Sequence, residues 1–310
     1  MIVVFDVGGS HIAAALFRPD SIELGPSHQI PAPVEEAPDK FFESLASLAR
    51  ETLGTSDALV GIAVAIPNPF DYEQGISYIH HKYPLLDGAN LRQGLSTHLK
   101  CEPQRIHFLN DAAAFLLGEL YDGAARGVSR AVGITLGTGV GSAFAVDDKI
   151  VVNGPGVPLD GRIWNLPYGD GIVEDAISTK AIQSRYERLT GTRAEVREIA
   201  CLGRDDPNAQ EAFAVFGTEL GRVLRYTCLA FAPERIVLGG GISQAATLFQ
   251  PATQEALGDF RVTLARAELL DSAALIGAGI SWMQSNTPEK VALRRSLGAC
   301  RHAERNCKPA

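Results

Sequence analysis

Two stretches of this chain resemble each other, and each predicts a β-hairpin with a glycine-rich tip. The first runs from Asp6 to Phe17 and the second from Thr135 to Val146. In both, an apolar strand is followed by a polar residue, a turn rich in glycine and a second apolar strand. Because each stretch opens one half of the chain, we interpret the pair as an internal duplication.

Apolar runs and helical patterns alternate along both halves. Runs typical of buried strands include 59–66, 106–109 and 236–238. Apolar residues at helical spacing occupy 39–53, 175–189 and 209–231. Strands mixed with helices predict an α/β fold, and a length of 310 residues predicts about two domains.

The composition excludes several classes of protein. The net charge of −8 disfavours nucleic acid as a partner, because phosphate binding needs clustered lysine and arginine. The N-terminus lacks the basic region of a signal peptide, and the apolar runs are too short to cross a membrane. Five cysteines without a CxxC pair suggest neither a disulfide framework nor a zinc ribbon. We therefore expect a soluble, cytoplasmic protein that binds neither nucleic acid nor membrane.

The glycines at 137–141 do not fit a dinucleotide-binding fingerprint, because a strand rather than a helix follows them. A glycine-rich hairpin tip still exposes backbone N–H groups that can bind an anion. Two such tips facing each other would hold a polyphosphate between two domains. A carboxylate beside the phosphates, such as Asp6, suits Mg²⁺.

Two further motifs lie where strands are predicted to end. Asn110 and Asp111 follow the apolar run 106–109 and precede a helical pattern, so the pair is either a helix N-cap or a site for a general base. The run 236–238 ends in Gly239, Gly240 and Gly241, which admit a flat group against the backbone.

These motifs occur in the order and spacing of the ROK family, which contains bacterial sugar kinases and related transcriptional repressors of the actin-like superfamily. The resemblance covers residues 1 to about 280. It implies an α/β fold of two actin-like (ribonuclease H-like) domains with an interdomain cleft. The expected domains are residues 1–117 and 118–288, followed by a basic and partly disordered tail at 289–310.

The resemblance also implies roles for individual residues in ATP-dependent phosphorylation of a hexose or hexose derivative. Asp111 would be the general base, Asn110 and Glu174 would bind the sugar, and Asp6 would organise Mg²⁺ through water. The remaining expected contacts are with the nucleotide: Gly8, Gly9 and Ser10 in one phosphate loop, Gly137, Thr138 and Gly139 in the other, and Gly239, Gly240 and Gly241 at adenosine. A homodimer is also expected from the family.

The chain departs from the family pattern at the sugar site. Arg162 and Asn165 stand where the family has a sugar-binding Glu and His, and the cysteine-rich zinc motif that should follow is absent, so no structural zinc is expected. Arg162 either pairs with an anionic substituent of the substrate or serves a structural role. Residues 80–82, which follow Pro67-Asn68-Pro69, either line the cleft or form a solvated loop.

Three functions compete. The first is the sugar kinase, with ATP or polyphosphate as donor. The second is a catalytically weak or inactive sugar-binding regulatory protein. The third, a NAD-dependent dehydrogenase, rests only on the glycines at 137–141. A DNA-binding repressor is not expected, because the phosphate motif begins at Asp6 and leaves no room for a preceding helix-turn-helix domain.

Overall fold

The structure is a computed structural model and describes residues 1–54, 59–80 and 82–286. These residues form two compact units. Unit 1 contains Met1–Ala114 and residues 274–286, and unit 2 contains Phe115–Ala273. Both units are α/β, as predicted, and each is built around one five-stranded sheet.

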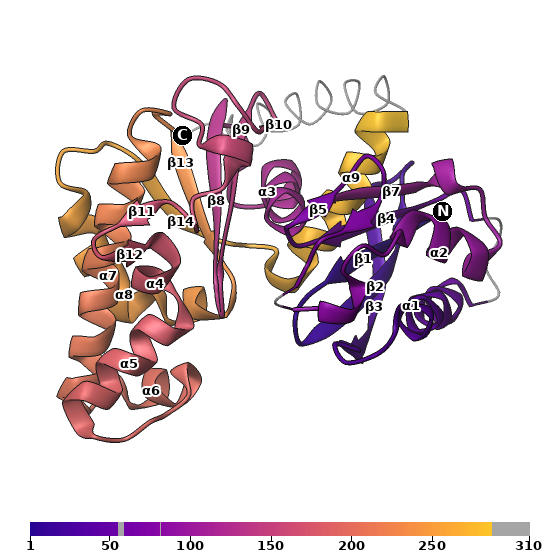
Figure 1. Cartoon of the computed structure of the whole chain (residues 1–310). Helices are drawn as coiled ribbons and strands as arrows, with labels where there is room; N and C mark the ends of the chain where they lie inside the picture. The colour runs from indigo at the N-terminus through magenta and orange to yellow at the C-terminus, as the bar shows by residue number, and fades with distance from the viewer. Residues whose placement is uncertain (55–58, 81, 287–310) are drawn as a thin grey trace, which may run out of the picture. The chain divides into compact units, whose positions relative to one another are not determined.

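The sheet of unit 1 has the strand order β3-β2-β1-β4-β7 (Figure 1). β1 pairs antiparallel with β2 and parallel with β4, which in turn pairs parallel with β7. Short strands β5 and β6 form a separate hairpin. The bounds are β1 Ile2–Val7, β2 His11–Arg18, β3 Glu23–Pro31, β4 Gly61–Ile66, β5 Phe70–Asp71, β6 Ile76–Ser77 and β7 Ile106–Asn110.

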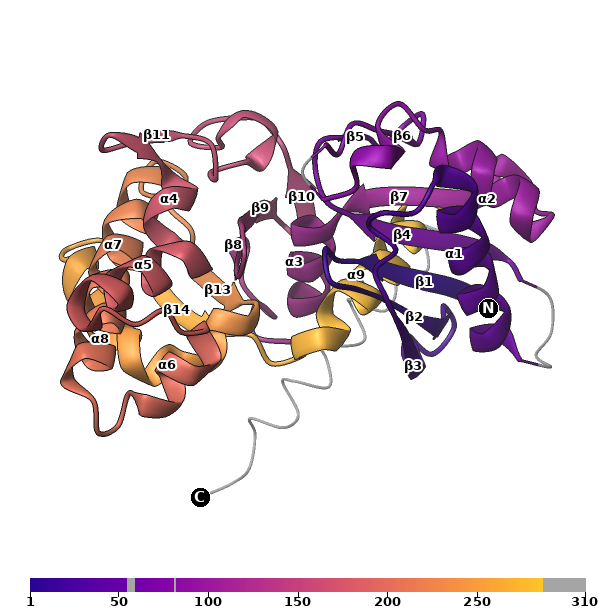
Figure 2. The same cartoon turned by 60° about the horizontal axis from the view of Figure 1, so that its bottom comes forward.

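Helices cover both faces of the unit 1 sheet. One face, which carries Val3 and Phe5, packs on α1 (Pro38–Leu53) and α2 (Leu91–Leu99), which lie side by side in Figures 1 and 2. Phe17 lies on the other face and packs against α9 (Ala273–Asn286), where a methyl group on Gly279 would come within 2.5 Å of its ring. The sheet is therefore buried on both sides. Short 3₁₀ turns are η1 Pro84–Leu86 and η2 Pro103–Arg105.

The sheet of unit 2 has the order β10-β9-β8-β13-β14. β8 pairs antiparallel with β9 and parallel with β13, and β13 pairs parallel with β14. β11 and β12 form a small hairpin outside the sheet. The bounds are β8 Arg130–Leu136, β9 Val140–Val146, β10 Lys149–Val151, β11 Pro167–Tyr168, β12 Gly171–Ile172, β13 Arg235–Gly239 and β14 Thr263–Arg266.

The helices of unit 2 also lie on both faces of their sheet. α3, whose residues from Phe115 onward belong to unit 2, covers one face, where Phe115 and Leu116 pack on Gly133 of β8. The other face forms the main core with helices that include α7 and α8, which run side by side in Figures 1 and 2. The bounds are α3 Asp111–Asp122, α4 Val173–Ile177, α5 Thr179–Thr190, α6 Val196–Leu202, α7 Pro207–Cys228 and α8 Ala246–Leu257, with 3₁₀ turns η3 Leu159–Gly161, η4 Gly241–Ala245 and η5 Leu270–Ser272.

The two sheets have the same strand order and the same strand directions. β1–β2 and β8–β9 occupy equivalent positions, and each is the hairpin that the repeated sequence predicts. The repeat seen in the sequence therefore extends from the hairpins to the strand order of the whole sheet. No described helix is long and apolar enough to cross a membrane.

The units differ from the predicted domains at both ends of unit 2. The first division lies between residues 114 and 115 instead of 117 and 118, and α9 groups with unit 1 although residues 118–288 were expected in one domain. The reason is packing: the indole of Trp282 and the backbone of Gly279 lie against the unit 1 sheet. The expected tail at 289–310 is outside the described residues.

The predicted helix at 175–189 is two helices. The backbone at Ser178 is extended, with φ −110° and ψ 176°, and separates α4 from α5. This break lets the N–H of Thr179 donate to the carbonyl oxygen of Gly137 at 2.8 Å. A contact with a distant loop thus overrides a continuous helical pattern.

Candidate functional site

The carboxyl ends of three parallel strands gather the predicted residues of unit 1 at one edge of its sheet. β1 ends beside Asp6, β4 ends at Ile66, and β7 ends at Asn110, which is in register with Ile66. Ligands of open α/β sheets collect at such an edge. The predicted strand-to-helix position of Asn110 and Asp111 is confirmed, because β7 ends at Asn110 and α3 begins at Asp111.

The first glycine tip, residues 8–10, is closed by two contacts at Gly8. Its N–H donates to the carbonyl oxygen of His11 at 3.0 Å, and its own carbonyl oxygen accepts the hydroxyl of Tyr83. Gly9 and Ser10 are exposed, and the Ser10 hydroxyl lies 3.0 Å from Nδ1 of His11. The tip is thus fixed at its base and open at its end.

Asp6 is half-buried at the base of this tip. Burial, and after it the negative charge of Asp6, raises the pKa of Tyr83. The carboxylate of Asp6 is therefore close to the phenol that holds the tip. A carboxylate beside the exposed backbone of a glycine tip is compatible with Mg²⁺, which keeps several waters and would take further oxygens from a bound phosphate.

The carboxylate of Asp111 is held through one of its two oxygens. Oδ1 accepts the N–H of Ala112 at 2.9 Å and the side-chain amide of Asn110 at 2.9 Å. Within the described part of the chain, no group donates to Oδ2. Asn110 also caps α3, because its Oδ1 accepts the N–H of Ala113 at 3.1 Å. The two interpretations left open by the sequence are therefore compatible: the pair caps a helix and leaves one carboxylate oxygen available.

Asn68, and Tyr72, which sequence reasoning did not single out, extend this network. Tyr72 accepts a hydrogen bond from Nδ2 of Asn110 at 3.3 Å and donates to Oδ1 of Asn68 at 3.0 Å. Asn68 precedes a cis peptide bond to Pro69. The signal in the sequence was the Pro67-Asn68-Pro69 loop, which follows the strand next to β7.

The second glycine tip, residues 137–139 between β8 and β9, is held by α4 and α5. Glu174 of α4 accepts the N–H of Val140 through Oε2 at 2.9 Å, and the same oxygen would lie 2.7 Å from a methyl group on Gly139. Thr179 of α5 donates to the carbonyl of Gly137. Thr138, at the end of the tip, is exposed. Glu174 was predicted to bind the sugar, and here its carboxylate positions the tip.

The three glycines after β13 differ in their surroundings. A methyl group on Gly239 would lie 2.5 Å from the ring of Phe115, and one on Gly240, where φ is +79°, would overlap the backbone of Leu136. A methyl group on Gly241 would meet no atom within 4 Å. Gly239 and Gly240 thus allow close packing of the backbone, and Gly241 borders open space.

Arg162 and Asn165 lie in a segment that is tied to β9 and α4. The Ser142 hydroxyl bonds the carbonyl of Gly161 at 2.7 Å and the N–H of Ile163 at 3.1 Å. Arg162 forms an ion pair with Asp160, with Nη2 and Oδ2 2.5 Å apart, while Asn165 is exposed. Asp160 therefore balances the charge of Arg162.

The structure groups the predicted residues by unit. Asp6, residues 8–10, Asn110 and Asp111 come together in unit 1, and the second tip, Glu174 and Gly239–Gly241 come together in unit 2. In unit 2, Gly239 is in register with Thr135, so the three glycines and the second tip lie at the same edge of the sheet.

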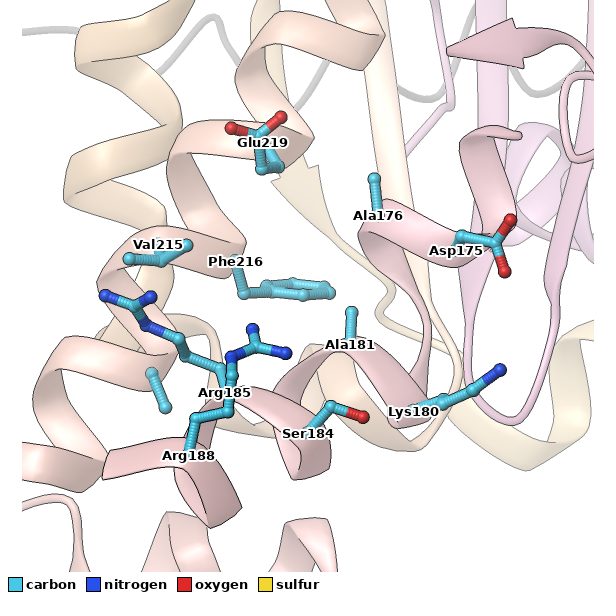
Figure 3. Close-up of a pocket in the computed structure, with 11 residues that line it drawn as sticks. Asp175, Ala176, Lys180, Ala181, Ser184, Arg185, Arg188, Val215, Phe216 and Glu219 are labelled. Atoms are coloured by element: carbon cyan, nitrogen blue, oxygen red, sulfur yellow. The ribbon is translucent and has the colours of Figure 1, made fainter. Parts of the chain in front are cut away.

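A cavity of about 330 Å³ lies elsewhere in unit 2, between helices α4, α5 and α7. Figure 3 shows Phe216 of α7 together with Lys180, Arg185 and Arg188 of α5. Arg185 forms an ion pair with Glu211. None of the predicted site residues lines this cavity.

Comparisons with known proteins agree with the predicted family. The sequence profile of the ROK family matches residues 2–162 and 167–285. Among curated proteins, the chain is 26% identical to the N-acetylgalactosamine kinase AgaK of Shewanella sp. (strain ANA-3), over 89% of this chain and 96% of that protein. It is 27% identical to a glucokinase of Halalkalibacterium halodurans, over 92% of this chain and 96% of the relative.

Solved structures show the same fold. A ROK family glucokinase from Streptomyces griseus, in complex with glucose and AMPPNP, aligns with a TM-score of 0.75 and 20% identity, covering 90% of this chain and 98% of that chain. The profile match includes both hairpins, the Asn110–Asp111 pair and the three glycines after β13. The chain belongs to the ROK family.

Proposed function

We propose that this protein transfers the terminal phosphoryl group of ATP to a hydroxyl of a hexose or hexose derivative. The observation that carries the proposal is the carboxylate of Asp111, which is held through Oδ1 and available through Oδ2. The family match and the curated relatives, which are sugar kinases, support the same enzyme class.

In the proposed reaction, Oδ2 of Asp111 takes the proton of the acceptor hydroxyl while that oxygen attacks the terminal phosphorus of the donor. The new O–P bond forms as the bond from phosphorus to the bridging oxygen of ADP breaks. Phosphoryl transfer depends mainly on positioning and charge stabilisation, and an oriented carboxylate supplies the first of these. Asn110 fixes the carboxylate and, as the resemblance implies, binds the sugar.

Each unit has its own candidate groups for donor binding in this proposal. The exposed end of the first tip, Gly9 and Ser10, and the end of the second tip, Thr138, offer backbone N–H groups to phosphate oxygens. Asp6 would hold Mg²⁺ through water, and the metal would neutralise negative charge on the transferred group. Gly241 borders the space proposed for adenosine.

The ion pair of Arg162 favours a neutral sugar as acceptor. Asp160 already balances the guanidinium charge, so an anionic substituent would have to displace a carboxylate. Because the relatives named above act on N-acetylgalactosamine and glucose, we propose a neutral hexose or N-acetylhexosamine. Asn165, exposed beside this segment, is proposed as a further sugar contact.

The test is a coupled ADP-release assay with Mg²⁺ over a panel of hexoses and N-acetylhexosamines. Asp111→Asn keeps an acceptor at Oδ1 and replaces only the oxygen proposed to accept the proton. We expect kcat to fall by about 10²- to 10⁴-fold, with unchanged thermal stability. Asp205→Asn, an exposed aspartate of unit 2, is the matched control. Light scattering on the same samples tests the expected homodimer.

Two results would count against the proposal. Turnover of Asp111→Asn at the wild-type rate would remove the general base. Sugar binding without ADP release on any acceptor would instead favour the sugar-binding regulatory protein, which the departures at Arg162 and Asn165 suggested.

A further inference from the structure

The side chain of Lys82 lies against Gly9 of the first glycine tip. A methyl group on Gly9 would lie 3.5 Å from Cδ of Lys82 and 3.8 Å from its Cγ and Cε. The hydrocarbon stem of the lysine therefore runs along the backbone of Gly9 at van der Waals distance. Its ammonium group is one bond beyond Cε, so it lies next to the tip.

The neighbouring residue fixes Lys82 in this place. Tyr83 is 1% exposed, its ring packs edge-on against Phe41 with centroids 5.4 Å apart, and its hydroxyl donates to the carbonyl of Gly8. The chain at residues 82 and 83 is thus attached to the tip through a buried side chain. The position of Lys82 is a consequence of the core and is not that of a free surface loop.

The bond from Tyr83 also sets the direction of a tip donor. The peptide between Gly8 and Gly9 is trans, so its carbonyl oxygen and its N–H point in opposite directions. Because the carbonyl faces Tyr83, the N–H of Gly9 faces away from it. Tyr83 is therefore a positioning residue for the backbone that is proposed to meet phosphate.

The negative charge expected at the tip favours a cation beside it. Asp6 lies at its base and the whole chain carries a net charge of −8, while a nucleoside triphosphate adds more negative charge. In the ranges that the structure describes, no carboxylate lies within ion-pair distance of the Lys82 ammonium. A lysine with an uncompensated charge on a flexible stem is well suited to binding phosphate as a point charge.

We propose that Lys82 binds a phosphoryl oxygen of the donor at the first glycine tip. The inference rests on the proposed function in that it takes residues 8–10 as a phosphate loop. It assigns a role to one residue of the segment 80–82, for which the sequence allowed a cleft lining but favoured a solvated loop; His81 is outside the described residues.

The test compares Lys82→Met with Lys82→Arg and with a control. Methionine keeps an unbranched apolar stem over Gly9 and removes only the charge, and arginine restores it. Lys100→Met removes an exposed lysine of the same unit, at the C-cap of α2. We expect Lys82→Met to raise KM for MgATP at least tenfold, to leave KM for the sugar within twofold, and Lys82→Arg to recover most of the loss.

A second measurement needs no turnover. Binding of inorganic tripolyphosphate, followed by isothermal titration calorimetry, should weaken at least tenfold in Lys82→Met and remain unchanged in Lys100→Met. If wild type phosphorylates no sugar but binds tripolyphosphate, and Lys82→Met weakens that binding at least tenfold, the proposed function fails while this inference stands. The inference would be overturned if wild type did not bind tripolyphosphate, or if Lys82→Met stayed within twofold of wild type in both assays. It would also be overturned if the variant raised only the KM for the sugar.

Discussion

Removing the carboxylate of Glu119 should destabilise unit 2 more than any exposed substitution. Glu119 lies in α3 and is 0% exposed. Oε2 accepts the N–H of Ala124 at 2.7 Å and that of Glu268 at 3.1 Å, and Oε1 accepts the N–H of Leu269 at 2.9 Å. One carboxylate therefore joins the two segments through which the chain enters and leaves unit 2.

The magnitude follows from these three bonds. A hydrogen bond to a charged group contributes about 1.5–3 kcal/mol, and a buried donor left without a partner costs about 1–3 kcal/mol. Glu119→Ala leaves three N–H groups without their acceptor and creates a cavity. We therefore expect the free energy of unfolding to decrease by about 3–5 kcal/mol. Glu119→Gln keeps one oxygen for two of the donors and turns its amide toward the third, so we expect about 1–3 kcal/mol.

Urea unfolding followed by circular dichroism measures these differences. At about 2–4 °C per kcal/mol for a unit of this size, Glu119→Ala should also lower Tm by about 6–20 °C. Glu187→Ala, an exposed residue of α5, is the control and should change the unfolding free energy by less than about 0.5 kcal/mol. A Glu119→Ala protein within about 1 kcal/mol of wild type would refute the reasoning.

Two further predictions use the glycines after β13 and the imidazole of His107. Gly239→Ala should cost about 1–3 kcal/mol, because its methyl group would meet the ring of Phe115, whereas Gly241→Ala should leave Tm unchanged and weaken ADP binding at least fivefold. Thermal unfolding and calorimetry separate the two effects, and equal Tm values for both variants would contradict the packing argument. Burial, and then the charge of Arg92, lowers the pKa of His107 to about 4. Between pH 6.5 and 4 the unfolded chain therefore binds a proton that the folded chain does not. The free energy of unfolding should decrease as the pH is lowered, by about 2 kcal/mol from pH 7 to pH 5. His107→Asn should remove this contribution, and urea unfolding that keeps the wild-type pH dependence would show that another group causes it.

The features that sequence predicts well are those whose determinants are adjacent in the chain. Both hairpins were predicted because strand, glycine turn and strand follow one another. The same holds for Asn110 and Asp111, where an apolar strand, a capping pair and a helix are contiguous. No long-range contact is needed to recognise either pattern.

β3 was not predicted, because its signal is weak for a physical reason. It is an edge strand that pairs only with β2, it contains Gly25 and Pro26, and all of its 9 residues are exposed or half-buried. An edge strand with a polar face needs no apolar alternation, and proline is tolerated there.

The contacts that complete the candidate site come from distant segments. Tyr83 reaches Gly8 across 75 positions, and Glu174 reaches Val140 across 34. The residue types were visible in the sequence, but which loop folds back on which tip depends on the packing of the whole unit. The family resemblance assigned Glu174 to the sugar, and its bond to the second tip is visible only in three dimensions.

The equivalent hairpins of the two sheets are held by different hydrogen bonds. In the first, the phenol of Tyr83 donates to the carbonyl of Gly8, and in the second, the carboxylate of Glu174 accepts the N–H of Val140. The repeated sequences place Ser10 where the second hairpin has Gly139, and any β-carbon at 139 would press on Glu174. Replacing the second turn by the sequence of the first would therefore preserve the strands but disrupt the contact between the turn and Glu174. The two sheets thus share one strand order, whereas each turn is specific to the loop or helix that contacts it.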